Sequence, residues 1–265
     1  MSDIFSDVSL AHFLFALAVF VLAAFVHGAV GLGFPMIATP ILAMSFGVKQ
    51  AIFLTLIPGL FINVISILRE QDAWRSLQRF LPVSLIASFG SFWGTTALLA
   101  SSPEPFRLLL AFAILFYLSI EKFRKKRIAW IKPHPLIAKI IFGMFAGLLG
   151  GMTNVMAPVL VIYFIEIDAE PKSAVVGLNF CFLLGKIVQL ALFIDDGAFQ
   201  SAEIFQHTPL LFFALAALWS GINLRKKITA FTWRNWLKKA LLIIALVLIV
   251  QASSSLILAC LLPCC

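Results

Sequence analysis

Long apolar runs follow one another along most of this chain, and clusters of glycine and proline interrupt two of them. Residues 28–40 read GAVGLGFPMIATP and residues 147–158 read GLLGGMTNVMAP, so that Gly33 to Pro40 and Gly151 to Pro158 have the same spacing. Unwound backbone at membrane depth exposes N–H and C=O groups, which are costly unless protein or water satisfies them. Paired interruptions of this kind are typical of a transport site.

The composition indicates a membrane protein with several spans. Of the 265 residues, 62% are hydrophobic and only 12% are charged, about half of the charged fraction usual in soluble domains. The net charge of +8 does not indicate nucleic-acid binding, because the basic residues lie between apolar runs and not in a recognition motif. The four cysteines have no metal-ligand spacing, so we predict no metal and no cofactor.

We predict an all-α polytopic protein with about ten transmembrane segments. The first five are expected at residues 10–30, 34–46, 50–68, 80–100 and 105–120. The second five are expected at residues 136–151, 154–166, 173–194, 208–223 and 240–262. This divides the chain into a first repeat over residues 1–121, a basic connector over 122–135 and a second repeat over 136–265.

The positions of the basic residues predict how these segments are oriented in the membrane. The stretches 69–79, 121–139 and 224–239 hold sixteen of the 20 Lys and Arg, whereas the loops expected on the other side hold only Lys49. The positive-inside rule therefore predicts that these stretches are cytoplasmic and that both termini lie outside. Short segments that re-enter the membrane, in place of crossing it, are the alternative.

Five segments in each half would relate the halves by a pseudo-two-fold axis in the membrane plane, giving two inverted repeats with broken short helices. A weak sequence match supports a duplication, because Lys49 and Ala51 precede the third segment as Lys172 and Ala174 precede the eighth.

The segments GLGFPMIATPIL and GGMTNVMAPVLVIY, each glycine-rich ahead of a proline and each opening one half of the chain, resemble the sulfite exporter TauE/SafE family of membrane permeases. The resemblance covers most of the chain. It implies transport of small sulfur-containing anions, such as sulfite, thiosulfate or organosulfonates, across a bacterial inner membrane. This chain departs from the family's more continuous glycine runs, with Phe34 and Pro35 after Gly33.

Lys186 is the main candidate for binding such an anion. It lies near the middle of an apolar segment, and no Asp or Glu falls in the central part of any segment. A charge at this depth is costly and is usually functional; snorkelling to the interface is the alternative. Counting from Lys49 and Lys172, the equivalent position in the first half is Asn63. We expect Asn63 and Lys186 to face each other as donors at the midplane.

The remaining candidate residues belong to the two interruptions, where free backbone N–H groups would also attract an anion. They are Gly31, Gly33, Pro40, Gly150, Gly151, Thr153, Asn154 and Pro158. Close helix packing by the glycines and local satisfaction of the broken backbone by Thr153 and Asn154 are the alternatives. His27 precedes the first interruption and is a candidate for proton coupling, although a structural role is the more usual one.

The sequence thus favours a secondary transporter of small anions that works by alternating access, with rocking of the inverted halves around a midplane site. The alternatives are a passive anion channel and a transporter of another small organic anion. An enzyme is disfavoured, because no catalytic grouping lies together in the apolar segments. The expected partners are the anion and the lipid bilayer, and a homo-oligomer is left open.

Overall fold

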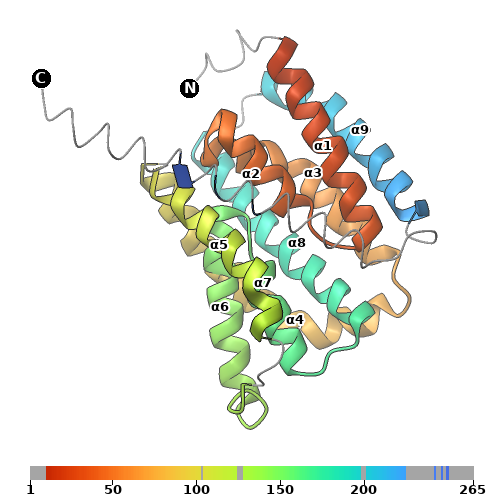
Figure 1. The fold of residues 1–265 in the computed structure, drawn as a ribbon, viewed down its shortest axis with the longest axis vertical. Helices are drawn as coiled ribbons and strands as arrows, with labels where there is room; N and C mark the ends of the chain where they lie inside the picture. Colours follow the sequence, from red (N-terminus) through yellow and green to blue (C-terminus); the bar gives the residue numbers. More distant parts are fainter. Residues whose placement is uncertain are drawn as a thin grey trace, which may run out of the picture.

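The structure is a computed structural model, and it describes residues 10–102, 104–123, 128–197 and 201–224 together with residues 242, 246, 249 and 250. Over these residues the chain forms nine α-helices (Figure 1). They are α1 (Leu10–Val30), α2 (Phe34–Phe46), α3 (Val48–Leu68), α4 (Ala73–Ala100), α5 (Glu104–Phe123), α6 (Pro135–Thr153), α7 (Ala157–Glu166), α8 (Pro171–Asp195) and α9 (Ser201–Leu224). The protein is an all-α membrane protein.

Five of these helices are long and apolar enough to cross a bilayer: α1, α3, α4, α6 and α8. The helices α2 and α7 have 13 and 10 residues, which gives lengths of about 20 and 15 Å. Both are shorter than a hydrocarbon core of about 30 Å. The described residues therefore contain five candidate spans and several shorter apolar helices, and the predicted tenth segment at 240–262 lies almost wholly outside the described residues.

The helix boundaries follow the sequence prediction closely in the first half, with one clear difference. The expected segment at 80–100 is part of α4, which begins at Ala73. Arg75 and Arg79 therefore lie on the first turns of a helix and not in a loop. A proline at position 82 lies inside α4, as membrane helices tolerate when neighbouring groups satisfy the freed carbonyl.

Two pairs of helices approach each other at glycine residues. Gly28 of α1 lies against the backbone of Gly221 in α9, and Gly151 of α6 lies against the backbone of Gly94 in α4. A Cβ atom on any of these glycines would collide with main-chain atoms of the partner helix. Small residues at helix crossings allow this close approach and the dispersion contacts that hold membrane helices together. Figure 1 shows α1 and α9 side by side.

Another contact between distant parts of the chain joins α3 to α8 in the interior. Most of the buried side chains are apolar, but both of these helices also bury polar residues. On α3 these are Thr55 and Asn63, and on α8 they are Asn179, Lys186 and Gln189. Polar side chains therefore line the α3–α8 contact in the interior, and α4 also buries Ser76, Ser84, Ser91 and Thr95.

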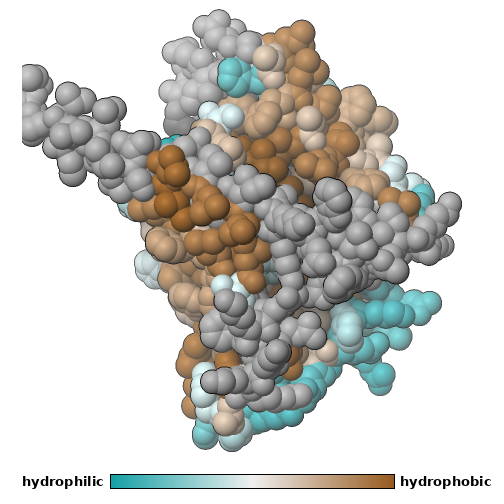
Figure 2. All heavy atoms as spheres, viewed as in Figure 1, coloured by the Kyte–Doolittle hydropathy of each residue, from teal (hydrophilic) through white to brown (hydrophobic). Residues whose placement is uncertain are grey.

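Basic side chains gather at one end of the helix bundle, which we call the basic end and define by Arg69, Arg75, Lys132 and Lys172. The first turns of α4 and α8 meet there through a hydrogen bond between Ser76 and Ser173. Lys132 also lies at this end and forms a 2.6 Å salt bridge to Asp168, in the loop that leads into α8. Figure 2 shows the hydrophilic residues of this end in teal and the apolar surface of the helices in brown.

Candidate functional site

The first interruption of the apolar runs is a three-residue break between α1 and α2. Gly31 and Gly33 have φ angles of 89° and 118°, which glycine adopts without the steric cost that a side chain adds. His27 caps the helix that follows, because the Phe34 N–H donates to His27 Nδ1 at 3.1 Å. His27 Nε2 lies 2.9 Å from Ser66 Oγ on α3.

These two contacts define what His27 does at the break. Because Nδ1 accepts from a backbone N–H, the neutral ring carries its proton on Nε2, which donates to Ser66. A second proton on Nδ1 would remove the acceptor of the Phe34 N–H. The geometry therefore assigns His27 a role in satisfying the broken backbone, and its role in proton coupling stays a prediction.

The second interruption lies between α6 and α7 at residues 154–156. Asn154 ends α6 with a φ angle of 64°, and its backbone N–H donates to Gly150 O at 2.8 Å. Pro158 lies in the first turn of α7, where its missing N–H costs nothing. Thr153 donates to Leu149 O within its own helix, so its hydroxyl serves local structure.

The side chain of Asn154 is the centre of a buried hydrogen-bond network. Its Nδ2 donates to Thr39 Oγ1 at 2.8 Å and to Thr55 Oγ1 at 2.9 Å. Its Oδ1 accepts from Lys186 Nζ at 2.9 Å. The second break therefore joins α2, α3 and α8 in the interior.

Lys186 is 1% exposed, and within the described part of the chain it forms no salt bridge. Its aliphatic chain crosses α3 at Gly59, where a Cβ atom would lie 2.5 Å from Cε, 2.9 Å from Cδ and 3.3 Å from Nζ. Thr55 and Gly59 are four residues apart and share one face of α3. The missing side chain at Gly59 thus provides the space through which the ammonium reaches Asn154.

Asn63 lies on the same face of α3, one turn beyond Gly59. It is 1% exposed, and its Nδ2 has no hydrogen-bond partner. On α3 the residue against the Lys186 side chain is Gly59, and Lys186 bonds to Asn154. That Asn63 and Lys186 face each other as donors stays a prediction. Thr95 on α4 is the second buried residue of the described chain whose polar side-chain atom lacks a partner.

Side chains of α8 also donate hydrogen bonds to backbone carbonyls at both breaks. Asn179 Nδ2 donates to Gly31 O at 3.0 Å in the first break. Gln189 Nε2 lies 3.2 Å from both Gly150 O and Gly151 O at the end of α6. Asn179, Lys186 and Gln189 are seven and three residues apart, so they line one face of α8.

The structure brings together some of the predicted site residues and separates others. Lys186, Asn154, Gly150 and Gly151 meet around the second break, whereas Gly31, Gly33 and His27 form the first. Pro40 lies inside α2 and marks no break. The sequence analysis did not identify Thr39, Thr55 and Gly59. The only pattern that could have indicated them is the spacing of Thr55 and Gly59, four residues apart in an apolar run.

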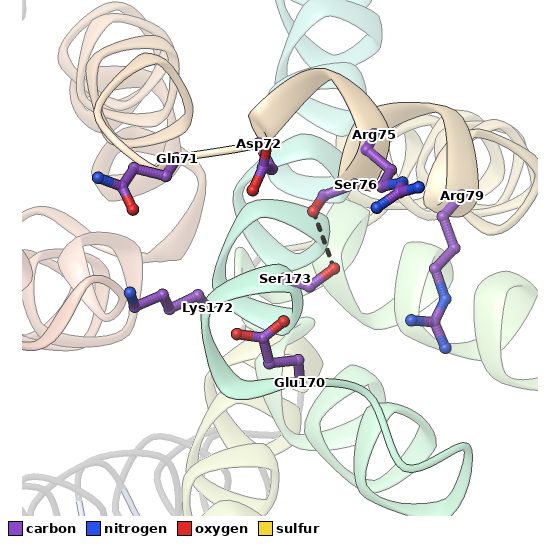
Figure 3. Close-up of a pocket in the computed structure, with 8 residues that line it drawn as sticks. All are labelled: Gln71, Asp72, Arg75, Ser76, Arg79, Glu170, Lys172 and Ser173. Atoms are coloured by element: carbon purple, nitrogen blue, oxygen red, sulfur yellow. Dashed lines mark hydrogen bonds between the residues drawn. The ribbon is translucent and has the colours of Figure 1, made fainter.

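Two pockets of about 630 Å³ each lie at the basic end. Figure 3 shows one of them, between the first turns of α4 and α8. The other lies over the first break, and Lys172 lines both. Both pockets thus combine basic side chains with the ends of helices that carry the buried polar network.

Comparison with known protein families matched residues 16–252 to the family described as sulfite exporter TauE/SafE. The match therefore covers both breaks, Asn63 and Lys186. Comparison with the curated proteins found no match, and comparison with the solved structures found none either.

Proposed function

Because the chain belongs to the sulfite exporter TauE/SafE family, whose members are membrane transporters and not enzymes, we propose that it carries a small sulfur-containing anion across the membrane. The proposed substrates are sulfite, thiosulfate and small organosulfonates. The proposed binding site lies between α3 and α8 and contains Lys186 and Asn63. Lys186 supplies the charge, and Asn63 supplies neutral donors.

A surplus of buried hydrogen-bond donors is the observation that carries this proposal. The Lys186 ammonium has three N–H groups, and the structure gives it one acceptor, Asn154 Oδ1. The amide nitrogen of Asn63, with two N–H groups, has no acceptor at all. Buried donors without partners are rare and costly. An oxyanion has several acceptor atoms and a compensating charge, so its chemistry matches this surplus.

Neighbouring groups support an anion at this site in preference to a cation. No carboxylate of the described chain lies against Lys186, and the two threonine hydroxyls near Asn154 are already engaged. Sulfite and sulfonates present three oxygens each, which suits an ammonium on one side and an amide on the other.

Helix boundaries and helix contacts support the inverted-repeat part of the proposal. The ends of α1 and α6, the starts of α2 and α7, and the starts of α3 and α8 are each separated by 123 residues. This offset pairs Pro35 with Pro158, and Asn63 with Lys186. In addition, α1 packs on α9 as α6 packs on α4, which is the exchange of partners expected when a two-fold axis relates the halves. Such an axis in the membrane plane suits alternating access.

The proposed orientation has the basic end in the bacterial cytoplasm and the N-terminus outside, as the positive-inside rule predicts. Single cysteines in place of Gln71 and Asp196, both exposed, would test it after the four native cysteines are replaced by alanine. The two positions should be labelled from opposite sides of the membrane. Labelling from the same side would contradict the orientation and the count of crossings between them.

Anion flux in proteoliposomes tests the binding site. Lys186→Ala should reduce sulfite or thiosulfate uptake at least tenfold, because one charged hydrogen bond to the substrate contributes about 1.5–3 kcal/mol. Lys132→Ala is the matched control, since Lys132 is exposed and pairs with Asp168 at the surface. Full flux by the Lys186→Ala protein at an unchanged protein level would refute the proposed binding site. Flux that does not saturate with anion concentration would favour a passive channel.

A further inference from the structure

The pocket over the first break, which we call the first-break cavity, opens at the basic end and reaches inward to the helix break. Its volume is about 630 Å³. It is lined by His27, Gly28, Gly31, Ser66, Arg69, Glu70, Lys172, Val175, Ile222 and Asn223. Of these, Arg69 and Lys172 are basic and Glu70 is acidic, so the charged groups of the lining carry a small positive excess.

Arg69 is held in place at the rim of the first-break cavity. Its guanidinium carbon lies 4.2 Å from the centroid of the Trp219 ring on α9, which is within the range of a cation–π interaction. This contact fixes the direction of a side chain that would otherwise sample many rotamers. A fixed guanidinium is a ready binding group for an oxyanion, because its planar fork can donate two parallel hydrogen bonds.

The floor of the first-break cavity borders the donor-rich interior. Ser66 lines the cavity on α3, and Asn63, whose amide nitrogen has no partner, lies one turn deeper on that helix. Val175 lines the cavity on α8, and Asn179, which donates to Gly31 O, lies one turn deeper on that helix. Polar side chains therefore continue from the cavity toward Lys186 on both helices.

The neighbouring pocket in Figure 3 has no such continuation. Arg75, Arg79 and Lys172 line it, but so do the carboxylates Asp72 and Glu170. Its inner side is closed by the hydrogen bond between Ser76 and Ser173.

One turn deeper than Ser76 on α4 lies Phe80, and one turn deeper than Ser173 on α8 lies Gly177. The Phe80 and Phe164 rings pack against each other 4.7 Å apart between their centroids, and both rings lie against Gly177. This apolar layer separates the Figure 3 pocket from the buried polar network.

We propose that the first-break cavity is the loading site at which the transported oxyanion first binds, with Arg69 as its main binding group. This inference rests on the proposed function, because it concerns the path of the same anion. The anion then passes the contact between His27 and Ser66 and reaches Asn63 and Lys186. The Figure 3 pocket takes no part in this path.

The test measures initial rates of sulfite transport in proteoliposomes, with sulfite supplied on the side that bears Arg69. Arg69→Gln should raise KM about threefold or more and leave kcat nearly unchanged, because a charge near the mouth of a path acts mainly on capture of the substrate. Arg75→Gln is the matched control, since Arg75 lines only the Figure 3 pocket. Its KM should equal that of the wild type.

A second pair of variants protects the test against misfolding of Arg69→Gln. Asn223→Glu adds a negative charge to the first-break cavity, and Gln71→Glu adds the same charge to the Figure 3 pocket; both residues are exposed. Only Asn223→Glu should raise KM, and added salt should reduce the difference. An unchanged KM in Asn223→Glu, or an equal rise in Gln71→Glu, would overturn the assignment. Absence of flux in the wild type would instead refute the proposed function.

Discussion

Gly59→Ala is the substitution that most directly tests whether the position of the Lys186 ammonium matters. A Cβ atom at position 59 would lie 2.5 Å from Lys186 Cε and 2.9 Å from Cδ, whereas ordinary contacts begin at 3.4 Å. The flexible end of Lys186 must therefore withdraw by about 1 Å. The distance from Nζ to Asn154 Oδ1, 2.9 Å in the structure, would then exceed the range of a hydrogen bond.

The size of the effect on transport follows from that lost alignment. A hydrogen bond to a charged group contributes about 1.5–3 kcal/mol, and about 1.4 kcal/mol corresponds to a tenfold change in rate. Gly59→Ala should therefore lower kcat/KM by about 10- to 150-fold. The lost hydrogen bond should also lower the stability of the fold, and the alanine should offset about 1 kcal/mol of this loss, because alanine is favoured over glycine within a helix by about that amount.

The assay is sulfite uptake into proteoliposomes, together with the thermal unfolding temperature of the purified protein in detergent. Gly143→Ala is the matched control, because its Cβ atom would lie 3.0 Å from a side-chain atom of Ile86 and 3.1 Å from Val83 O, and Lys186 is not among the nearest atoms that it would meet. The control should transport normally. Wild-type kinetics in a well-folded Gly59→Ala protein would refute the argument that the ammonium has to be held in this position.

Three further substitutions separate binding from structure in the same two assays. Asn63→Leu removes a buried donor that has no partner, so the unfolding temperature should stay equal or rise while flux falls at least tenfold; a fall in both would assign Asn63 to structure alone. Gln189→Leu leaves Gly150 O and Gly151 O without their side-chain donor, so stability should fall by about 1–3 kcal/mol, and unchanged stability would contradict this role. Lys186→Arg should restore only part of the flux lost in Lys186→Ala, because the planar guanidinium cannot occupy the space over Gly59 in the same way; full activity would show that charge alone suffices.

The sequence predicted the helices well where long apolar runs were bounded by glycine or by charge. The bounds of α1 and α2 agree with the structure to the residue. The sequence contained two different registers between the halves, one from the spacing of glycine to proline and one from Lys49 and Lys172. The equal spacing from glycine to proline paired Pro40 with Pro158, but Pro40 is inside α2, and the proline that opens α2 is Pro35. A proline tolerated within a membrane helix cannot be distinguished by pattern from one that begins a helix.

The site was predictable only in part, for a physical reason. The position of a lysine near the middle of an apolar segment made Lys186 a candidate without any knowledge of its neighbours. Its partner, Asn154, lies 32 residues away in the chain, and the space it crosses exists because position 59 has no side chain. The contacts of Lys186 with Gly59 and Asn154 depend on how α3, α6 and α8 pack against one another. The spacing of residues within one segment carries no information about this packing.

The glycine contacts between α1 and α9 and between α4 and α6 bear on which parts of the protein can move. At these glycines the backbones of the two helices are in direct contact. Sliding one helix along the other by even one residue would drive side chains into main-chain atoms, so we expect the two helices of each pair to move together. Each pair contains one helix from either half of the chain. We therefore expect any movement that accompanies transport to keep α1 with α9 and α4 with α6, so that the N-terminal and C-terminal halves do not separate as two bodies.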